Sequence, residues 1–169
     1  MVDAPAPAAT PETRLVERGL VLPGTAPKPI GSFCNVRRSG RLLFVSGQGP
    51  VTEDGTFLRG KVGEDVTAEE AREHACLVAV NILAVLRGHC GSLDRVGGVV
   101  KLLGLVNATP DFERHPFVID GASDLLGEIF GVPGVHSRSA FGVGSLPNNI
   151  TVEIEGIFEI AEAQAGTGP

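Results

Sequence analysis

The pattern of apolar and polar positions predicts one long helix near the middle of the chain, and capping signals predict a shorter one before it. The clearer helix lies in "DVTAEEAREHACLVAVNILAVLRGHCG", which opens with the capping box Thr67-x-x-Glu70 and closes near Gly88 or Gly91. A shorter two-turn helix is predicted after Thr10, whose hydroxyl can cap it. Pro11 stands at its first helical position and Gly19 ends it. The dense apolar face of the longer helix requires a sheet to pack against.

Strands are predicted before and after the long helix in the sequence. "NVRRSG" and "RLLFVSG" flank the turn Ser39-Gly40 and predict a β-hairpin. The Val/Leu-rich stretch Arg95–Thr109 predicts a further strand, and 109–131 predicts a second helical region interrupted at Pro116 and Gly121. "SRSAFGVG" and "TVEIEG", separated by a turn, predict a closing hairpin. The order of two strands, helix, strand, helix and two strands predicts a two-layer α+β sandwich.

The alternation of side chains in the closing hairpin separates two faces. If both apolar sets lie under the helices, Arg138 and Glu153 share the opposite face, about 13 Å apart at roughly 3.3 Å per residue. Small residues beside Arg138 leave bare backbone, which is expected where a ligand or another chain approaches, and another subunit is the simplest occupant. The residues expected under the helices are Phe141 and Val143 on the first strand and Val152, Ile154 and Phe158 on the second. The residues expected on the opposite face are Arg138, Ala140, Gly142 and Gly144 on the first strand and Glu153, Glu155 and Glu159 on the second.

Composition and charge narrow the function classes. The net charge is −6 and basic residues form no block, which argues against nucleic acid as a partner. No pair of histidines has the spacing of metal ligands, so no metal site is expected. The densest apolar run is too short for a bilayer, and the beginning of the chain does not resemble a signal peptide, so a cytoplasmic protein is expected. The three cysteines share no CxxC motif and are expected to be small buried hydrophobes.

The organisation expected from composition is one domain with two tails. Residues 1–10 are rich in Ala and Pro and are expected to be mobile, as are residues 162–169. Residues 11–161 then form the single domain, a size at which one core is usual.

Two motifs carry a resemblance to a known family. "SRSAFGVGSLPNNITVEIEG" and "FVSGQGPV" resemble the signatures of the Rid superfamily (reactive intermediate deaminase, YjgF-like, also labelled endoribonuclease L-PSP), here a longer and mostly uncharacterised branch of it. The resemblance implies a chorismate-mutase-like fold and a homotrimer. In such a trimer the sheets surround a barrel-like centre, and clefts lie between the subunits. No cofactor is expected.

The resemblance also assigns residues by position. Arg138 matches the arginine that holds the substrate carboxylate, and Glu153 matches the glutamate proposed to position or activate water. Phe33 replaces a tyrosine of the deaminases, so that a hydroxyl is missing. The expected substrate-binding residues also include two further departures from the family, His136 in place of proline or alanine and Ala140 in place of a common cysteine. The stretch Ser46, Gly47 and Gln48, which matches the family, completes the set. On the residues alone, an interface arginine and a solvated strand glutamate are the more frequent outcomes for Arg138 and Glu153.

Three functions remain open at this point. The first is hydrolysis of imine or enamine intermediates of 2-imino acids to 2-oxo acids and ammonia, with Arg138 as anchor and Glu153 orienting water. The second is a non-catalytic binder of small carboxylate metabolites, which the missing hydroxyl at Phe33 favours. RNA cleavage ranks last, because a basic stripe and stacking Tyr or Trp are absent.

Overall fold

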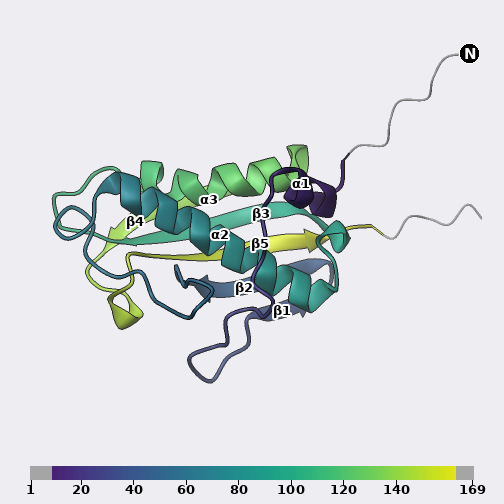
Figure 1. Cartoon of the computed structure of the whole chain (residues 1–169), viewed down its shortest axis with the longest axis horizontal. Coiled ribbons are helices and arrows are strands. Elements are labelled where there is room, and N and C mark those ends of the chain that lie inside the picture. The colour runs from purple at the N-terminus through teal and green to yellow at the C-terminus, as the bar shows by residue number, and fades with distance from the viewer. Residues whose placement is uncertain (1–8, 163–169) are drawn as a thin grey trace, which may run out of the picture.

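The computed structural model describes residues 9–162, so most of both predicted tails lies outside the described residues. The described chain forms one five-stranded sheet, with α2 and α3 packed across one of its faces (Figure 1). This is the predicted two-layer α+β sandwich, and the predicted order of elements is confirmed. The elements are α1 (Pro11–Glu17), β1 (Val36–Ser39), β2 (Leu42–Gln48), α2 (Ala68–Cys90), β3 (Val96–Asn107), α3 (His115–Phe130), β4 (Ser137–Val143) and β5 (Val152–Ile160).

The strand order in the sheet is β1-β2-β5-β3-β4, and only β4 pairs in parallel, with β3. Parallel neighbours need a crossover connection, and α3 supplies it between β3 and β4. The closing hairpin expected from the sequence is therefore wrong. β3 lies between β4 and β5, so that Leu105 pairs with Phe141 on one side and with Glu153 on the other.

Local signals set the helix ends as expected. The Thr10 hydroxyl accepts a hydrogen bond from the backbone of Thr13, and Thr67 and Glu70 form the complete capping box of α2. Gly91 ends α2 in the left-handed conformation, with φ of 83°. The predicted interruption of the second helical region is wrong, because α3 runs unbroken over 16 residues.

Two residues explain why α3 is continuous. Pro116 lies in the first turn of α3, where its missing N–H costs no hydrogen bond. Gly121 faces α2 at so short a distance that a Cβ there would collide with the backbone carbonyl of Arg72. The glycine is therefore a helix-packing residue and not a break.

The core lies between the helices and the covered face of the sheet. Its largest fully buried side chains are Phe158, Leu43, Ile82, Leu83, Leu86, Leu93, Leu102, Ile119, Leu125, Leu126, Ile129 and Ile154. One buried polar side chain connects this core to a loop: the Asn81 amide donates to the carbonyls of Gly49 (3.1 Å) and Val51 (3.0 Å). The loop after β2 is thereby attached to α2.

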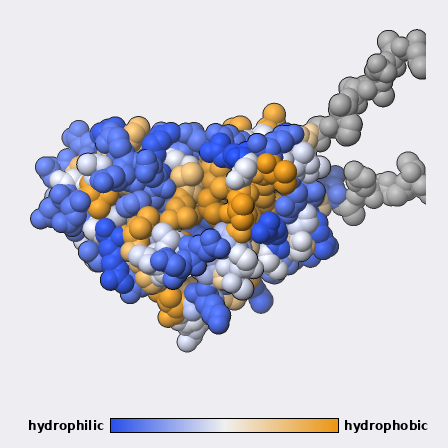
Figure 2. Space-filling model, in the orientation of Figure 1, coloured by the Kyte–Doolittle hydropathy of each residue, from blue (hydrophilic) through white to orange (hydrophobic). Residues whose placement is uncertain are grey.

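The structure also bears on the cysteines and on membrane spans. Cys76 and Cys90 are half-buried, but Cys34 is exposed, so burial was the wrong expectation for that cysteine. Among the helices of residues 9–162, none has the length and apolar character that crossing a membrane requires, and the side of the molecule that the helices cover carries both hydrophilic and hydrophobic patches (Figure 2).

Candidate functional site

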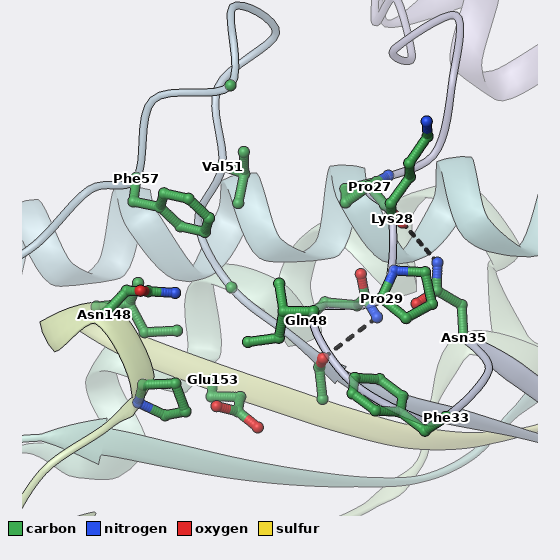
Figure 3. Close-up of a pocket in the computed structure, with 16 residues that line it drawn as sticks. Pro27, Lys28, Pro29, Phe33, Asn35, Gln48, Val51, Phe57, Asn148 and Glu153 are labelled. Atoms are coloured by element: carbon green, nitrogen blue, oxygen red, sulfur yellow. Dashed lines mark hydrogen bonds between the residues drawn. The ribbon is translucent and has the colours of Figure 1, made fainter.

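A cavity of about 430 Å³ lies at the end of β2, beside Glu153 (Figure 3). Three segments that are distant in sequence form it: the stretch 27–35, the loop 49–57 and the turn before β5. Phe33 and Phe57 contribute aromatic walls, and Glu153 lies at the floor. The remaining lining residues are Pro27, Lys28, Pro29, Ile30, Asn35, Gly47, Gln48, Gly49, Val51, Gly55, Pro147, Asn148 and Ile150.

An irregularity in β2 opens the cavity. The register between β2 and β5 shifts between Val45 and Gln48, as in a β-bulge, which redirects the strand next to the glutamate. Gly47 faces the Glu153 side chain so closely that a Cβ at Gly47 would collide with the carboxyl group. Gln48 is 5% exposed, and its amide donates to the carbonyls of Ser46 (3.0 Å) and Gly47 (3.2 Å). The "SGQ" motif thus shapes the wall around the glutamate.

The Glu153 carboxyl is half-buried, and no hydrogen bond or ion pair from residues 9–162 engages it. Burial raises its pKa above the ordinary value of 4.5, and the nearby carboxylate of Glu155 adds to this shift. A raised pKa brings a carboxyl closer to the range in which it both accepts and releases a proton. An unpaired glutamate in an apolar cavity is therefore suited to general acid–base chemistry.

Arg138 does not line this cavity. It pairs with Leu102, which is fully buried under the helices, so its side chain lies on the helix-covered face of β4. One guanidinium nitrogen donates to Asp120 (2.8 Å) and to Ser123 (2.9 Å), and the other donates to the carbonyl of Pro116 (3.3 Å). All three partners belong to α3.

Glu153 lies on the opposite face, because it alternates with the buried residues Val152 and Ile154. The expectation that Arg138 and Glu153 share one face is therefore wrong. That expectation placed Phe141 under the helices, yet Phe141 is 48% exposed on the open face. The sheet is apolar on part of both faces, so hydrophobicity alone selected the wrong face of β4.

The small residues of β4 have a different role from the one expected. A Cβ at Gly142 would collide with the His115 ring at the start of α3, and Ala140 packs against the hydrophobic core. At Gly142 the neighbour is therefore the chain's own helix α3, whereas a Cβ at Gly144 would meet no atom within 4 Å.

Arg138 lies instead in a second recess, of about 420 Å³, together with His136 and Ser123. The His136 Nδ1 lies 2.6 Å from the carbonyl of Gly134, which makes this nitrogen a donor; in the neutral ring Nε2 is then an acceptor. Ser123 then donates to Nε2 over 3.0 Å while it accepts from Arg138. His136, Ser123 and Arg138 thus form one chain of hydrogen bonds.

Sequence reasoning missed the role of Asp120 and left that of Ser123 open. Their signal was their spacing: residues three apart on a helix project from the same face, here toward Arg138. Asp124, whose role was also open, binds Arg72 of α2 instead (2.5 Å).

The predicted substrate-binding residues therefore lie in different hollows of the molecule. Phe33, Gly47 and Gln48 lie with Glu153 in the first cavity, and His136 lies with Arg138 in the second recess. The Ser46 hydroxyl donates to the carbonyl of Cys34 (2.8 Å), and Ser46 faces a neighbouring hollow on the open side of the sheet. Within residues 9–162, no group of three or more His, Cys, Asp or Glu side chains is arranged to hold a metal ion.

Comparison with known proteins gives relatives over most of the chain. The family model described as "YjgF/chorismate_mutase-like, putative endoribonuclease" matches residues 12–159. Protein TCP17 of Trypanosoma cruzi is 36% identical over 143 residues, which are 84% of this chain and 89% of that protein. A 2-iminobutanoate/2-iminopropanoate deaminase of Dermatophagoides farinae is 30% identical over 135 residues, or 80% and 91% of the two chains.

Solved structures agree with this result. The crystal structure of Atu1372, a protein of unknown function from Agrobacterium tumefaciens, is 41% identical in sequence. It superimposes with a TM-score of 0.80 over 90% of this chain and 94% of that one. The sequence signatures, the fold and the family match over residues 12–159 lead to one conclusion: the chain belongs to the YjgF/chorismate mutase-like family, in which the Rid proteins are found.

Proposed function

We propose that the chain hydrolyses reactive imines of 2-imino acids to 2-oxo acids and ammonia. The observation that carries the proposal is the Glu153 carboxyl, half-buried, unpaired within residues 9–162 and raised in pKa, on the floor of a cavity. The relative from Dermatophagoides farinae that is named as a deaminase of this class adds support. The substrate is accordingly a small metabolite that bears a carboxylate, and not a nucleic acid.

The proposed reaction needs one base and water. Glu153 takes a proton from the water whose oxygen bonds to the imine carbon, which gives a carbinolamine. The imine reacts in its protonated form, so the carbinolamine nitrogen is neutral until Glu153 protonates it. The C–N bond then breaks, and the departing ammonia takes the proton of the remaining hydroxyl, which becomes the carbonyl of the 2-oxo acid. Glu153 returns its proton in the second half of the reaction. No residue changes its oxidation state, and the proposal involves no cofactor.

The substrate carboxylate requires a cation, and Arg138 is the proposed one. Its planar fork suits a carboxylate better than a lysine ammonium does. Because Arg138 and Glu153 of one chain lie on opposite faces, a site that contains both requires Arg138 from a second copy. We therefore propose a homotrimer with sites between its subunits. Exposed Phe44 and Phe141 on the uncovered face of the sheet support such an assembly, since isolated apolar faces of this kind are usually buried.

A second candidate function is the binding of small carboxylates without catalysis. Two observations favour it. Phe33 offers no hydroxyl to the cavity, and Arg138 is already paired with Asp120 in its own chain. Ligand binding would then have to displace or share this partner.

Imine decay distinguishes the two functions. An amino acid oxidase generates the imine in situ, and semicarbazide trapping measures how fast the imine disappears with and without the purified protein. We expect Glu153→Gln to lower kcat by about 10² to 10⁴-fold, the usual contribution of a general base. Arg138→Ala should raise KM and abolish benzoate binding, and Arg138→Lys should restore it poorly.

The same samples test the assembly. Light scattering should give a trimer for the wild type and for both variants at Arg138. A wild type that binds benzoate through Arg138 but leaves the imine untouched would establish the second function. A stable monomer at micromolar concentration would contradict the shared site.

A further inference from the structure

The cavity beside Glu153 is much larger than a three-carbon substrate. 2-Iminopropionate has six non-hydrogen atoms and occupies on the order of 100 Å³, about three times the ~30 Å³ that a water molecule takes in the liquid. The cavity measures about 430 Å³. Even with the guanidinium of Arg138 from a second copy beside it, a substrate of this size would leave roughly half of the cavity empty or filled with water.

The walls of the cavity are mainly apolar. Phe33 and Phe57 lie at opposite ends in Figure 3, and Val51 pairs with Phe57 through a β-bridge that places both on the same wall. Only two ionisable residues are among the lining residues, Lys28 and Glu153. In the same view the Lys28 amine points away from Glu153. Beyond the catalytic carboxyl, the space therefore suits hydrocarbon and not a second charged group.

The wall cannot close around a small ligand without breaking buried interactions. Asn81 holds the carbonyls of Gly49 and Val51, and Asn81 is only 1% exposed. Collapse of this loop onto a three-carbon substrate would leave the buried amide unpaired, which is costly. The cavity is thus expected to keep its size when the substrate binds.

We propose that this site takes 2-imino acids with a large apolar side chain, aromatic or branched, in preference to those with three or four carbons. The inference rests on the proposed function. The imine carbon lies beside Glu153, and the side chain lies between the rings of Phe33 and Phe57 against Val51. The preferred substrates therefore derive from amino acids such as phenylalanine or leucine.

The preference is measured as the ratio of kcat/KM for the phenylalanine-derived imine to kcat/KM for the alanine-derived imine. We expect a ratio of about 30 for the wild type. This corresponds to about 2 kcal/mol at 1.36 kcal/mol per tenfold change, within the range for burying one large apolar side chain. Val51→Phe fills the cavity and Phe57→Ala removes one wall, so both should lower the ratio. Val16→Phe is the matched control, because Val16 is 80% exposed on α1 and lies outside the lining; its ratio should equal that of the wild type.

A binding arm keeps this inference separate from the proposed reaction. Calorimetry with 3-phenylpropionate and with propionate measures the same preference in the absence of chemistry, and circular dichroism confirms that each variant is folded. Tighter binding of 3-phenylpropionate that is weakened by both cavity variants supports the inference even if no imine is hydrolysed. In that case only the proposed reaction fails. Equal affinities for the two acids, or a ratio near one with an active enzyme, would overturn the inference.

Discussion

Gly47→Ala offers a sharp test of the position of Glu153, because it adds one methyl group directly against the carboxyl. An ideal Cβ at Gly47 would overlap with the carboxyl and would also touch the rest of the Glu153 side chain. Ordinary contact begins near 3.4 Å. The carboxyl must therefore move by roughly an ångström or more before the methyl group fits.

The expected cost falls on activity and not on stability. The Glu153 carboxyl is the far end of a flexible side chain, which rotates aside without disturbing the backbone. A misplacement of about 1 Å in a catalytic group typically costs on the order of 10²-fold in rate. We therefore expect kcat for imine hydrolysis to fall about 100-fold, while the melting temperature changes little.

The pH dependence of activity provides a second readout. In the wild type, burial raises the pKa of Glu153, and a base must be ionised to act, so activity rises with pH as this carboxyl ionises. A carboxyl displaced toward solvent loses the burial effect, so the acidic limb of the profile should shift to lower pH in Gly47→Ala. Gly24→Ala is the matched control, since a Cβ at Gly24 meets no atom within 4 Å. Wild-type kcat and an unshifted profile in Gly47→Ala would refute the assignment of Glu153 as the base.

Three further predictions concern other parts of the molecule. Burial lowers the pKa of His74, which is hydrogen-bonded to buried Thr151, so the fold should lose stability as pH falls from about 6.5 through the lowered pKa. Thermal denaturation at several pH values should show a weaker loss in His74→Asn. Identical curves for the two proteins would contradict the role of His74 in this loss. Asp120→Asn should free Arg138 and tighten benzoate binding by up to about fivefold, the equivalent of ~1 kcal/mol for a partly exposed ion pair. If calorimetry shows weaker binding instead, Asp120 positions the arginine for its ligand. Cys34 should react first with a thiol reagent at pH 7.5, because it is exposed while burial raises the pKa of the other two cysteines; mass spectrometry identifies the labelled residue.

The parts of the fold that were predictable from the sequence depend on local interactions. The Thr67–Glu70 capping box and the Thr10 cap involve residues within one turn of each other, so their signals lie next to the helices that they begin. The apparent break at Gly121 shows the limit of such signals. Glycine lowers helix propensity, but a contact with Arg72 on another helix decides its role, and that contact is invisible in the local sequence.

The candidate site was only partly predictable, again because long-range contacts decide it. The sequence identified Arg138 and Glu153 as candidates, but whether they lie together depends on which strands pair. A turn between β4 and β5 suggested a hairpin, whereas β3 occupies the position between them and places Arg138 and Glu153 on opposite faces. Asp120 contacts Arg138 only because α3 packs over β4, and 18 residues separate them in the sequence. Strand order and helix packing are long-range properties, and they determine which charges meet.

The attachment of the loop after β2 to Asn81 also bears on the thermodynamics of binding. A flexible loop loses conformational entropy when it closes around a ligand, and this loss reduces affinity. The Gly49 and Val51 carbonyls are already fixed to the amide of a buried asparagine before any ligand arrives. Ligand-free and ligand-bound forms should therefore superimpose closely over residues 49–51, and selectivity in this cavity should arise from preorganised shape and not from induced fit.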